Sequence, residues 1–218
     1  WGSQSSYGNL GVGDRANRSS PTQIGALTTW SKVGSGARFA HAIKTDGTLW
    51  AWGYNGQGQL GDGTVIHRSS PVQIGALTTW THASNGYKNF VGRTSDGKVW
   101  VTGQSGSGTL SIGSTSTDRS SPVQVGDLTN WTATNMGYRT GFGIKSDGTL
   151  WAWGKNTKGT MAQGNVTSPI ESPAQVGALT NWSNVPAGDG RGFAAEKSDG
   201  TLWNWGDRWQ MGDNAFIS

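Results

Sequence analysis

The chain repeats one short alternation of apolar and polar positions four times. Each copy is a ten-residue phrase with an Asp-Gly pair, and in three of the four copies two tryptophans follow it with one smaller residue between them: KTDGTLWAWG (44–53), TSDGKVWVTG (94–103), KSDGTLWAWG (145–154) and KSDGTLWNWG (197–206). Successive side chains of a strand point to opposite faces, so Trp50 and Trp52 share one face while Leu49 and Ala51 share the other. A second short run precedes each Asp-Gly pair. We therefore expect a β-hairpin with a two-residue type I′ turn at each pair.

Other landmarks recur with the same period. The Asp-Gly pairs are spaced by 50, 51 and 52 residues. Three other landmarks have the same spacing within one residue: a Ser-Pro step, a Gln-Ile-Gly or Gln-Val-Gly step, and an isolated tryptophan (Trp30, Trp80, Trp131, Trp182). Within one period we expect a further strand over 31–35 and a fourth from either 58–61 or 71–74, and no segment has sustained helical periodicity. Four short strands in about 51 residues are typical of a propeller blade, so the pattern predicts an all-β propeller.

The period divides the chain into a single β-propeller segment over 1–218 with about four blades. The expected repeats run approximately over 1–51, 52–101, 102–152 and 153–204, and 205–218 starts a further blade. Trp1-Gly2 and Trp205-Gly206 occupy the same repeat position. A chain that closes on itself should not begin and stop within one phrase. We therefore expect either a segment of a longer polypeptide, which we favour, or a ring that partner chains close.

Composition narrows the class of protein. The 13 tryptophans and 36 glycines indicate a folded, turn-rich protein built on tryptophan, and the absence of cysteine excludes disulfides and thiolate sites. A net charge of +4 does not by itself imply nucleic-acid binding, and no apolar run approaches the length of a membrane span. We expect no nucleic-acid partner and no membrane insertion.

The repeated tryptophans are interpreted as structural. Blades stack face to face, so large residues opposed by small ones would fill the gap between them. Thr102 stands where the other repeats have Trp52, Trp153 and Trp205, which predicts a looser contact between blades there. Trp209 lies outside the repeated positions and is the best candidate for an exposed, glycan-stacking tryptophan.

The phrases IKTDGTLWAWG, GQLGDGT and SSPVQIG resemble the regulator of chromosome condensation repeat family, over essentially the whole chain and most closely in its bacterial, phage and large-virus members. The resemblance implies a β-propeller, most often of seven blades. Some members are exchange factors for a small GTPase, one is a secreted β-lactamase inhibitor, and many are surface or adhesion proteins. The chain departs from the family's usual His or Ser seven residues before the aspartate, where it has Phe39, Asn89, Thr140 and Gly192. It is also shorter than a seven-bladed ring.

Sites for chemistry are few. Residues 56–61 match GxGxxG by letter, but they lead into turn residues and a proline instead of the helix that a dinucleotide requires. The three histidines have no metal-ligand spacing. Asp46, Asp96, Asp147 and Asp199 belong to hairpin turns, where the tolerance of aspartate for left-handed geometry would explain them. We predict no catalytic residues, no metal site, no cofactor and no enzyme activity.

One recurrence is harder to explain by folding. A basic residue lies eight positions before each Asp-Gly aspartate, and in two repeats a tyrosine precedes it: Arg38, Lys88, Arg139 and Arg191, with Tyr87 and Tyr138. Equivalent positions of a propeller lie on one circle, so these residues would form an arc of like charge that suits an anionic partner. Solvation of each loop, or local pairing with a carbonyl, is the alternative explanation. A second series, Arg18, Arg68 and Arg119, fails at Ile170 and is assigned to loop solvation.

The sequence predicts a non-enzymatic interaction or structural module, displayed on a cell or virion surface, that binds a protein or an anionic glycan. Two alternatives stay open: a regulator of a small GTPase, which would act in the cytoplasm, and a secreted protein inhibitor of an enzyme. The exchange-factor alternative requires a protruding insertion, for which spacings of 50–52 residues leave no room.

Overall fold

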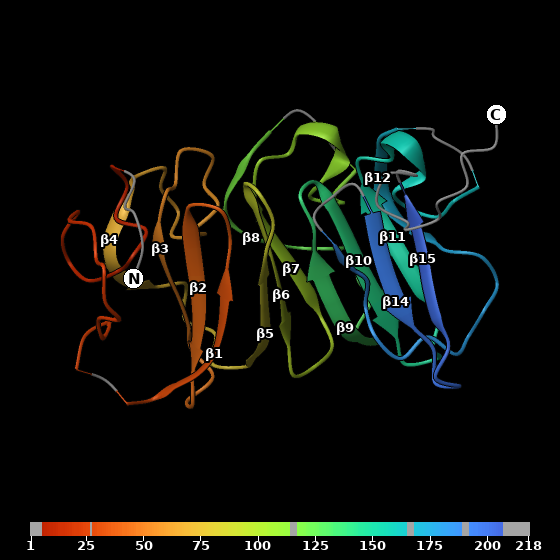
Figure 1. The fold of residues 1–218 in the computed structure, drawn as a ribbon, viewed down its shortest axis with the longest axis horizontal. Coiled ribbons are helices and arrows are strands. Elements are labelled where there is room, and N and C mark those ends of the chain that lie inside the picture. Colours follow the sequence, from red (N-terminus) through yellow and green to blue (C-terminus); the bar gives the residue numbers. More distant parts are fainter. Residues whose placement is uncertain (1–5, 27, 114–116, 165–167, 189–191, 207–218) are drawn as a thin grey trace.

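The protein is a row of antiparallel sheets that stand side by side (Figure 1). The computed structural model describes residues 6–26, 28–113, 117–164, 168–188 and 192–206. The first blade comprises β1 (Trp30–Ser35), β2 (Phe39–Lys44), β3 (Leu49–Gly53) and β4 (Arg68–Gln73). The second comprises β5 (Trp80–Asn85), β6 (Asn89–Thr94), β7 (Val99–Gly103) and β8 (Arg119–Gln124).

The third and fourth blades continue the row. The third comprises β9 (Trp131–Met136), β10 (Thr140–Lys145), β11 (Leu150–Gly154) and β12 (Ile170–Gln175). The fourth comprises β13 (Ala187–Gly188), β14 (Gly192–Glu196) and β15 (Leu202–Gly206). Two short 3₁₀ turns, η1 (Gly106–Gly108) and η2 (Thr157–Gly159), lie in the loops that follow β7 and β11. The fold is the all-β propeller architecture that the period predicted.

The first strands of the complete blades lie next to one another. In each complete sheet the strands pair in chain order, so β1, β5 and β9 are edge strands, and β1 contacts β5 while β5 contacts β9. Of the two sequence segments considered for the fourth strand, the structure selects the one that includes 71–74: β4 covers Arg68–Gln73. The sheets begin at the isolated tryptophans or just after them. The blades therefore do not start and end at the repeat boundaries expected from the sequence.

The hairpin at each Asp-Gly pair forms, but its turn is not of type I′. The Gly47 N–H donates to the Lys44 carbonyl, the Lys44 N–H donates to the Thr48 carbonyl, and only Gly47 has a positive φ, of 77°. This is a three-residue loop, a type I turn followed by a glycine bulge. Asp46 is conserved in the four phrases for another reason: its Oδ1 accepts from the Thr48 N–H at 3.0 Å and from the Thr48 hydroxyl at 2.6 Å. The left-handed explanation for the aspartate is therefore wrong.

The two tryptophans of the repeated phrase take different places in the first blade. Trp52 is buried, and its indole Nε1 donates to the Asn9 carbonyl of the preceding segment at 3.2 Å, so it spans the gap between repeats. Trp50 is half-buried; its Nε1 donates to the Thr48 hydroxyl at 2.9 Å, and the Lys44 Nζ lies 3.6 Å from its ring centroid. The structural interpretation is confirmed for these side chains. Trp209 lies outside the described residues.

The prediction of a looser contact at Thr102 is wrong. Thr102 is fully buried, and its hydroxyl donates to the Gln59 carbonyl at 2.8 Å, the counterpart of the Trp52 bond. The missing volume comes from the partner strand: Phe90 is paired with Thr102, whereas Ala40 is paired with Trp52. In the first blade the large side chain of the pair lies on the third strand, and in the second blade it lies on the second strand. The gap between the blades therefore stays filled.

His41 lies fully buried between the first two blades and gives the protein a predicted acid sensitivity. Its Nδ1 lies 2.8 Å from the Asn85 Oδ1, its ring stacks on Phe90, and burial lowers its pKa to about 4. Because the folded protein holds this ring neutral, the stabilisation is complete above the unfolded pKa of about 6.5 and is lost as the pH falls toward 4. Between pH 7 and pH 5 we expect a loss of about 2 kcal/mol in the free energy of unfolding.

Urea unfolding at the two pH values measures this loss. The variant His41→Gln serves as the control, since it has no proton to gain in this range and its stability should change less between pH 7 and pH 5. Equal pH dependence in the two proteins would show that His41 is not responsible.

Candidate functional site

The predicted basic positions lie in the turns between the first and second strands of successive blades. Arg38, Lys88 and Arg139 directly precede β2, β6 and β10. Each backbone carbonyl accepts an N–H from the residue after the third strand of the same blade, at 2.8–3.0 Å: Tyr54, Gln104 and Lys155. These bonds therefore fix the backbone of each position, and the side chain takes no part in them. Arg191 lies outside the described residues.

The three turns lie next to one another. A Cβ added at Gly36 would lie 2.9 Å from the Gly86 carbonyl oxygen, and one added at Gly86 would clash with the Gly137 carbonyl oxygen. Side chains at these positions would force the blades apart, so glycine permits the close approach. The Tyr87 N–H also donates to the Tyr138 carbonyl at 3.3 Å. The structure thus brings the turns before β2, β6 and β10 into one row at one end of the blades.

Tyrosines fill the space between the basic side chains. The rings of Tyr87 and Tyr138 stack with centroids 4.6 Å apart and planes 26° apart. The Lys88 Nζ lies 5.6 Å from the Tyr87 centroid, and the Arg139 Cζ lies 5.4 Å from that of Tyr138. Both distances are within the range of cation–π attraction. Two aromatic rings and two cations from neighbouring blades therefore form a single cluster, in which Tyr138 is exposed.

The ion pairs of the described residues leave these cations free of carboxylates. They join Arg18 to Asp14, Arg68 to Asp62, and Lys98 to Asp96. Cations that no carboxylate of the described residues neutralises are suited to an external anion.

Sequence reasoning missed an aromatic cluster that extends the basic row past Arg38. Tyr7, Tyr54 and His67 contact one another with centroids 4.7–4.9 Å apart, and the Arg38 Cζ lies 5.8 Å from the Tyr7 centroid. The His67 Nδ1 accepts from the Asn55 N–H at 2.9 Å, and partial burial, followed by the charge of Arg15, lowers the His67 pKa. These residues do not repeat along the chain, so periodicity could not single them out.

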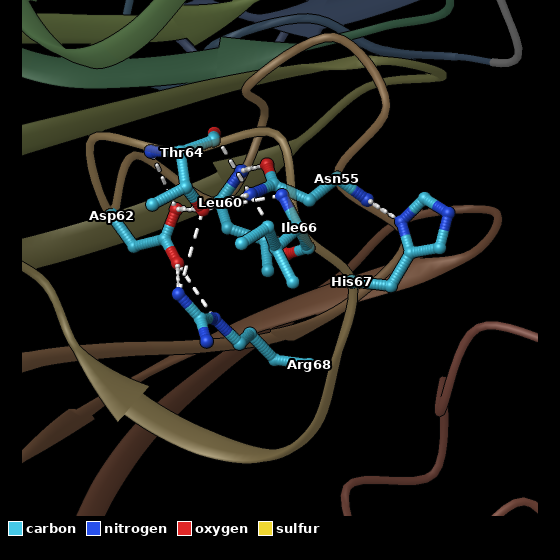
Figure 2. A network of polar contacts seen from close by, with 7 residues as sticks. All are labelled: Asn55, Leu60, Asp62, Thr64, Ile66, His67 and Arg68. Atoms are coloured by element: carbon cyan, nitrogen blue, oxygen red, sulfur yellow. Dashed lines mark hydrogen bonds and ion pairs between the residues drawn. The ribbon is translucent and has the colours of Figure 1, made fainter.

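The loop after β3 is closed by polar contacts of its own (Figure 2). The Asn55 Oδ1 accepts from the Leu60 N–H, and its Nδ2 donates to the Thr64 and Ile66 carbonyls and to Asp62, all at 3.0–3.1 Å. Arg68 binds the Asp62 carboxylate through Nε at 2.8 Å. The assignment of Arg68 to loop solvation is therefore wrong: its guanidinium holds the loop, and residues 56–61 are a structural turn.

The aspartates of the hairpin turns are also engaged. The Lys98 side chain, and then the Thr94 hydroxyl, lower the pKa of Asp96 to about 2, and the neighbouring threonine lowers that of Asp46, Asp147 and Asp199. These carboxylates stay ionised at neutral pH and serve the turns. Within the described residues no three histidine or acidic side chains gather where they could hold a metal ion. In the same part of the chain no helix has the length and apolar character needed to cross a bilayer.

Parts of the sequence match known repeats. Two sequence models of the regulator of chromosome condensation (RCC1) repeat match residues 46–90, and residues 30–59 and 131–160, respectively. A stretch of 48 residues is 46% identical to the regulator of chromosome condensation of Xenopus laevis and covers 22% of this chain and 11% of that protein.

Solved structures with the same fold include human WBSCR16, with a TM-score of 0.79 and 19% identity over 92% of this chain. Another is Prp20p of Saccharomyces cerevisiae, described together with its binding to Gsp1p and histones, with a TM-score of 0.75 and 16% identity over 88% of this chain. The yeast protein bound to Kap60 gives a TM-score of 0.76. The chain spans about half the length of these relatives, 55%, 49% and 48% respectively. Residues 30–90 and 131–160 therefore match the regulator of chromosome condensation repeat, and the chain has the β-propeller fold of RCC1-like proteins.

Proposed function

We propose that the protein is a binding module without catalytic activity, and that it holds an anionic partner on the row formed by Arg38, Lys88 and Arg139. The observation that carries the proposal is the cluster of Tyr87, Tyr138, Lys88 and Arg139. Two cations from adjacent blades flank two stacked rings, and neither is among the ion-paired side chains of the described residues. Like charges held together cost stability, so a partner that neutralises them is favoured.

The chemistry of the row fits sulfate, carboxylate or phosphate groups. Guanidinium and ammonium groups donate charge-assisted hydrogen bonds to such anions, and exposed tyrosine rings offer a flat surface to a sugar or a side chain. We infer a sulfated or carboxylated glycan, or an acidic protein surface, as the partner class, and display on a cell or virion surface as the setting. Arg191 would extend the row into the fourth blade.

An exchange factor for a small GTPase is less favoured. That function is expected to need an insertion between strands, and equivalent loops within the three complete blades differ in length by at most one residue. The proposed partner instead binds a repeated surface, so its affinity should depend on several equivalent cations and fall steeply with salt.

Charge removal tests the proposed function. The triple variant Arg38→Gln, Lys88→Gln, Arg139→Gln should lose most of its retention on a heparin column at about 0.1 M salt, where surface charges still act over roughly 10 Å. Its melting temperature should change little, because the backbone carbonyls of these residues make the structural bonds. A matched variant that removes the same charge elsewhere, Lys32→Gln, Lys98→Gln, Arg119→Gln, should keep its retention. Equal losses in the two variants would contradict the proposed row and indicate attraction by net charge alone.

A further inference from the structure

Three of the four blades hold a lysine ammonium against two tryptophan rings. In the first blade the Lys44 Nζ lies 3.6 Å from the ring centroid of Trp50 and 5.3 Å from that of Trp30. The third and fourth blades repeat the arrangement, with the ammonium 3.3–3.6 Å from one ring and 5.1–5.2 Å from the other: Lys145 with Trp151 and Trp131, and Lys197 with Trp203 and Trp182. Among aromatic side chains, tryptophan attracts a cation most strongly. These blades therefore each contain a site for an alkylammonium group.

The second blade keeps the two rings but supplies no lysine to them. The centroids of Trp80 and Trp100 are 6.3 Å apart, and those of the corresponding pairs in the other blades are 6.1–6.2 Å apart. Thr94 stands at the position of Lys44, and it lacks the three terminal atoms of a lysine side chain. No cation of the described residues lies over either ring. The rings of the Trp80–Trp100 pair thus keep their separation without a cation of this chain.

The turn of the second blade has its lysine after the Asp-Gly pair instead of before it. Its five residues are TSDGK (94–98), whereas the third blade has KSDGT (145–149). The Lys98 Nζ binds the Asp96 carboxylate at 2.7 Å, and the Thr94 hydroxyl donates to the same carboxylate at 2.6 Å. The Lys98 ammonium is therefore held by the turn. Because this ion pair is neutral as a whole, an incoming ammonium group meets no net charge from it.

Trp100 is the more accessible ring of its pair. It is half-buried, whereas Trp80 is buried. In the third and fourth blades the ammonium lies nearer to the more exposed ring, which is Trp151 or Trp203. The ring that would make the closest contact with a cation in the second blade can therefore be approached from outside the protein.

We propose that the Trp80–Trp100 pair is a second binding site of this protein and takes the lysine side chain of a partner protein. The incoming ammonium would occupy the place that a lysine of the chain itself occupies in the other three blades. That precedent identifies the occupant as an alkylammonium group. β6 begins directly after Lys88 and ends at Thr94, so this site and the basic row lie at opposite ends of the blade. The two sites are therefore independent of each other.

Titration with a blocked lysine, Nα-acetyl-lysine-N-methylamide, tests the site. NMR of the tryptophan indole N–H groups is the measurement. We expect saturable shifts of the Trp100 and Trp80 signals with a dissociation constant of roughly 1–100 mM, because two cation–π contacts alone give weak binding. The signals of Trp50 and Trp151 should shift severalfold less, since a lysine of the chain already lies over these rings. The Nε-acetylated form of the ligand has no charge and should cause no saturable shift.

The chain itself supplies the matched variant. The double substitution Thr94→Lys, Lys98→Thr converts TSDGK into the KSDGT of the third blade and leaves the composition and net charge of the protein unchanged. The introduced lysine should lie over the two rings, so the apparent affinity for the blocked lysine should fall at least severalfold while the melting temperature does not fall. A second variant, Trp100→Leu, removes one ring and should abolish the saturable shift of the Trp80 signal.

Three results would overturn the proposal. Equal shifts with the blocked lysine and with its Nε-acetylated form would show an apolar contact without a role for charge. Unchanged binding in the double variant and in Trp100→Leu would place the ligand elsewhere on the protein. The absence of any saturable shift up to about 0.2 M ligand would show that the rings are closed to an external ammonium. Retention on heparin measures the basic row separately, so either proposal can fail alone.

Discussion

Replacing Leu150 by alanine is expected to lower the free energy of unfolding by about 2–5 kcal/mol, which is the cost of deleting a fully buried leucine side chain and leaving a cavity. Leu150 is completely buried in the core cluster between the third and fourth blades, where Phe142 and Phe193 pack against each other with centroids 4.7 Å apart. The interface between blades is the main apolar core of such a fold, so the loss should appear in the whole transition. Urea unfolding followed by tryptophan fluorescence measures it.

The chain offers a matched control in the next repeat. Leu202 occupies the same position of the same phrase and is 76% exposed, so Leu202→Ala should cost less than about 1 kcal/mol. If Leu150→Ala and Leu202→Ala were equally mild, the stacking of the third blade on the fourth would be wrong.

Replacing Gly148 by alanine is expected to cost about 2–5 kcal/mol, from about 1–2 kcal/mol for a left-handed alanine and about 1–3 kcal/mol for crowding. Gly148 follows Asp147 in the turn between β10 and β11 and has a φ of 76°. A Cβ there would lie deep inside van der Waals contact of the Thr180 carbonyl oxygen, in the segment that leads to the fourth blade. Because that atom is backbone, it cannot swing aside, and the connection between the blades must shift.

Gly200 separates the two costs. It has the same place in its own turn and a φ of 80°, but a Cβ there would meet no atom of the described residues within 4 Å. Gly200→Ala should therefore lose only the conformational part, about 1–2 kcal/mol. Thermal unfolding of both variants at one protein concentration makes the comparison. Equal losses would show that the hairpin turns do not clamp the connections between blades.

The turns at the two ends of the blades fix the fold through backbone hydrogen bonds, so the side chains that they expose can vary. At one end of the blades, the carbonyls of Arg38, Lys88 and Arg139 hold the third strands, and the bonds use backbone atoms only. At the other end, the Asp-Gly turns hold the connections between blades. The side chains of the basic positions take no part in these bonds, which leaves them available to the proposed partner.

Much of the fold could be predicted because its strands and turns follow from short sequence patterns. The alternation in KTDGTLWAWG and the Asp-Gly turn predict a hairpin, and its fourfold recurrence predicts blades. The predicted type I′ turn was wrong. The sequence phrase does not show that the Thr48 hydroxyl, two residues on, would donate a hydrogen bond to the Asp46 carboxylate. The looseness at Thr102 was wrong because its compensation comes from Phe90 on another strand.

The candidate site was less predictable. The series of basic residues was visible by spacing, and the row of turns before β2, β6 and β10 follows from the blade geometry. The stack of Tyr87 on Tyr138 joins residues about 50 positions apart. Tyr7 contacts Tyr54 and His67, which lie about 50 and 60 positions away from it and whose types do not repeat. Only the packing of one blade on the next shows that they touch. The partner itself is still a prediction.

The sequence by itself determined the repeat, the strands and the face on which each side chain lies, because alternation and turn chemistry act within ten residues. The tertiary structure decided which volumes compensate one another and which cations lie over which rings. Those features depend on how neighbouring blades approach, and that approach is set by contacts between residues a whole repeat apart.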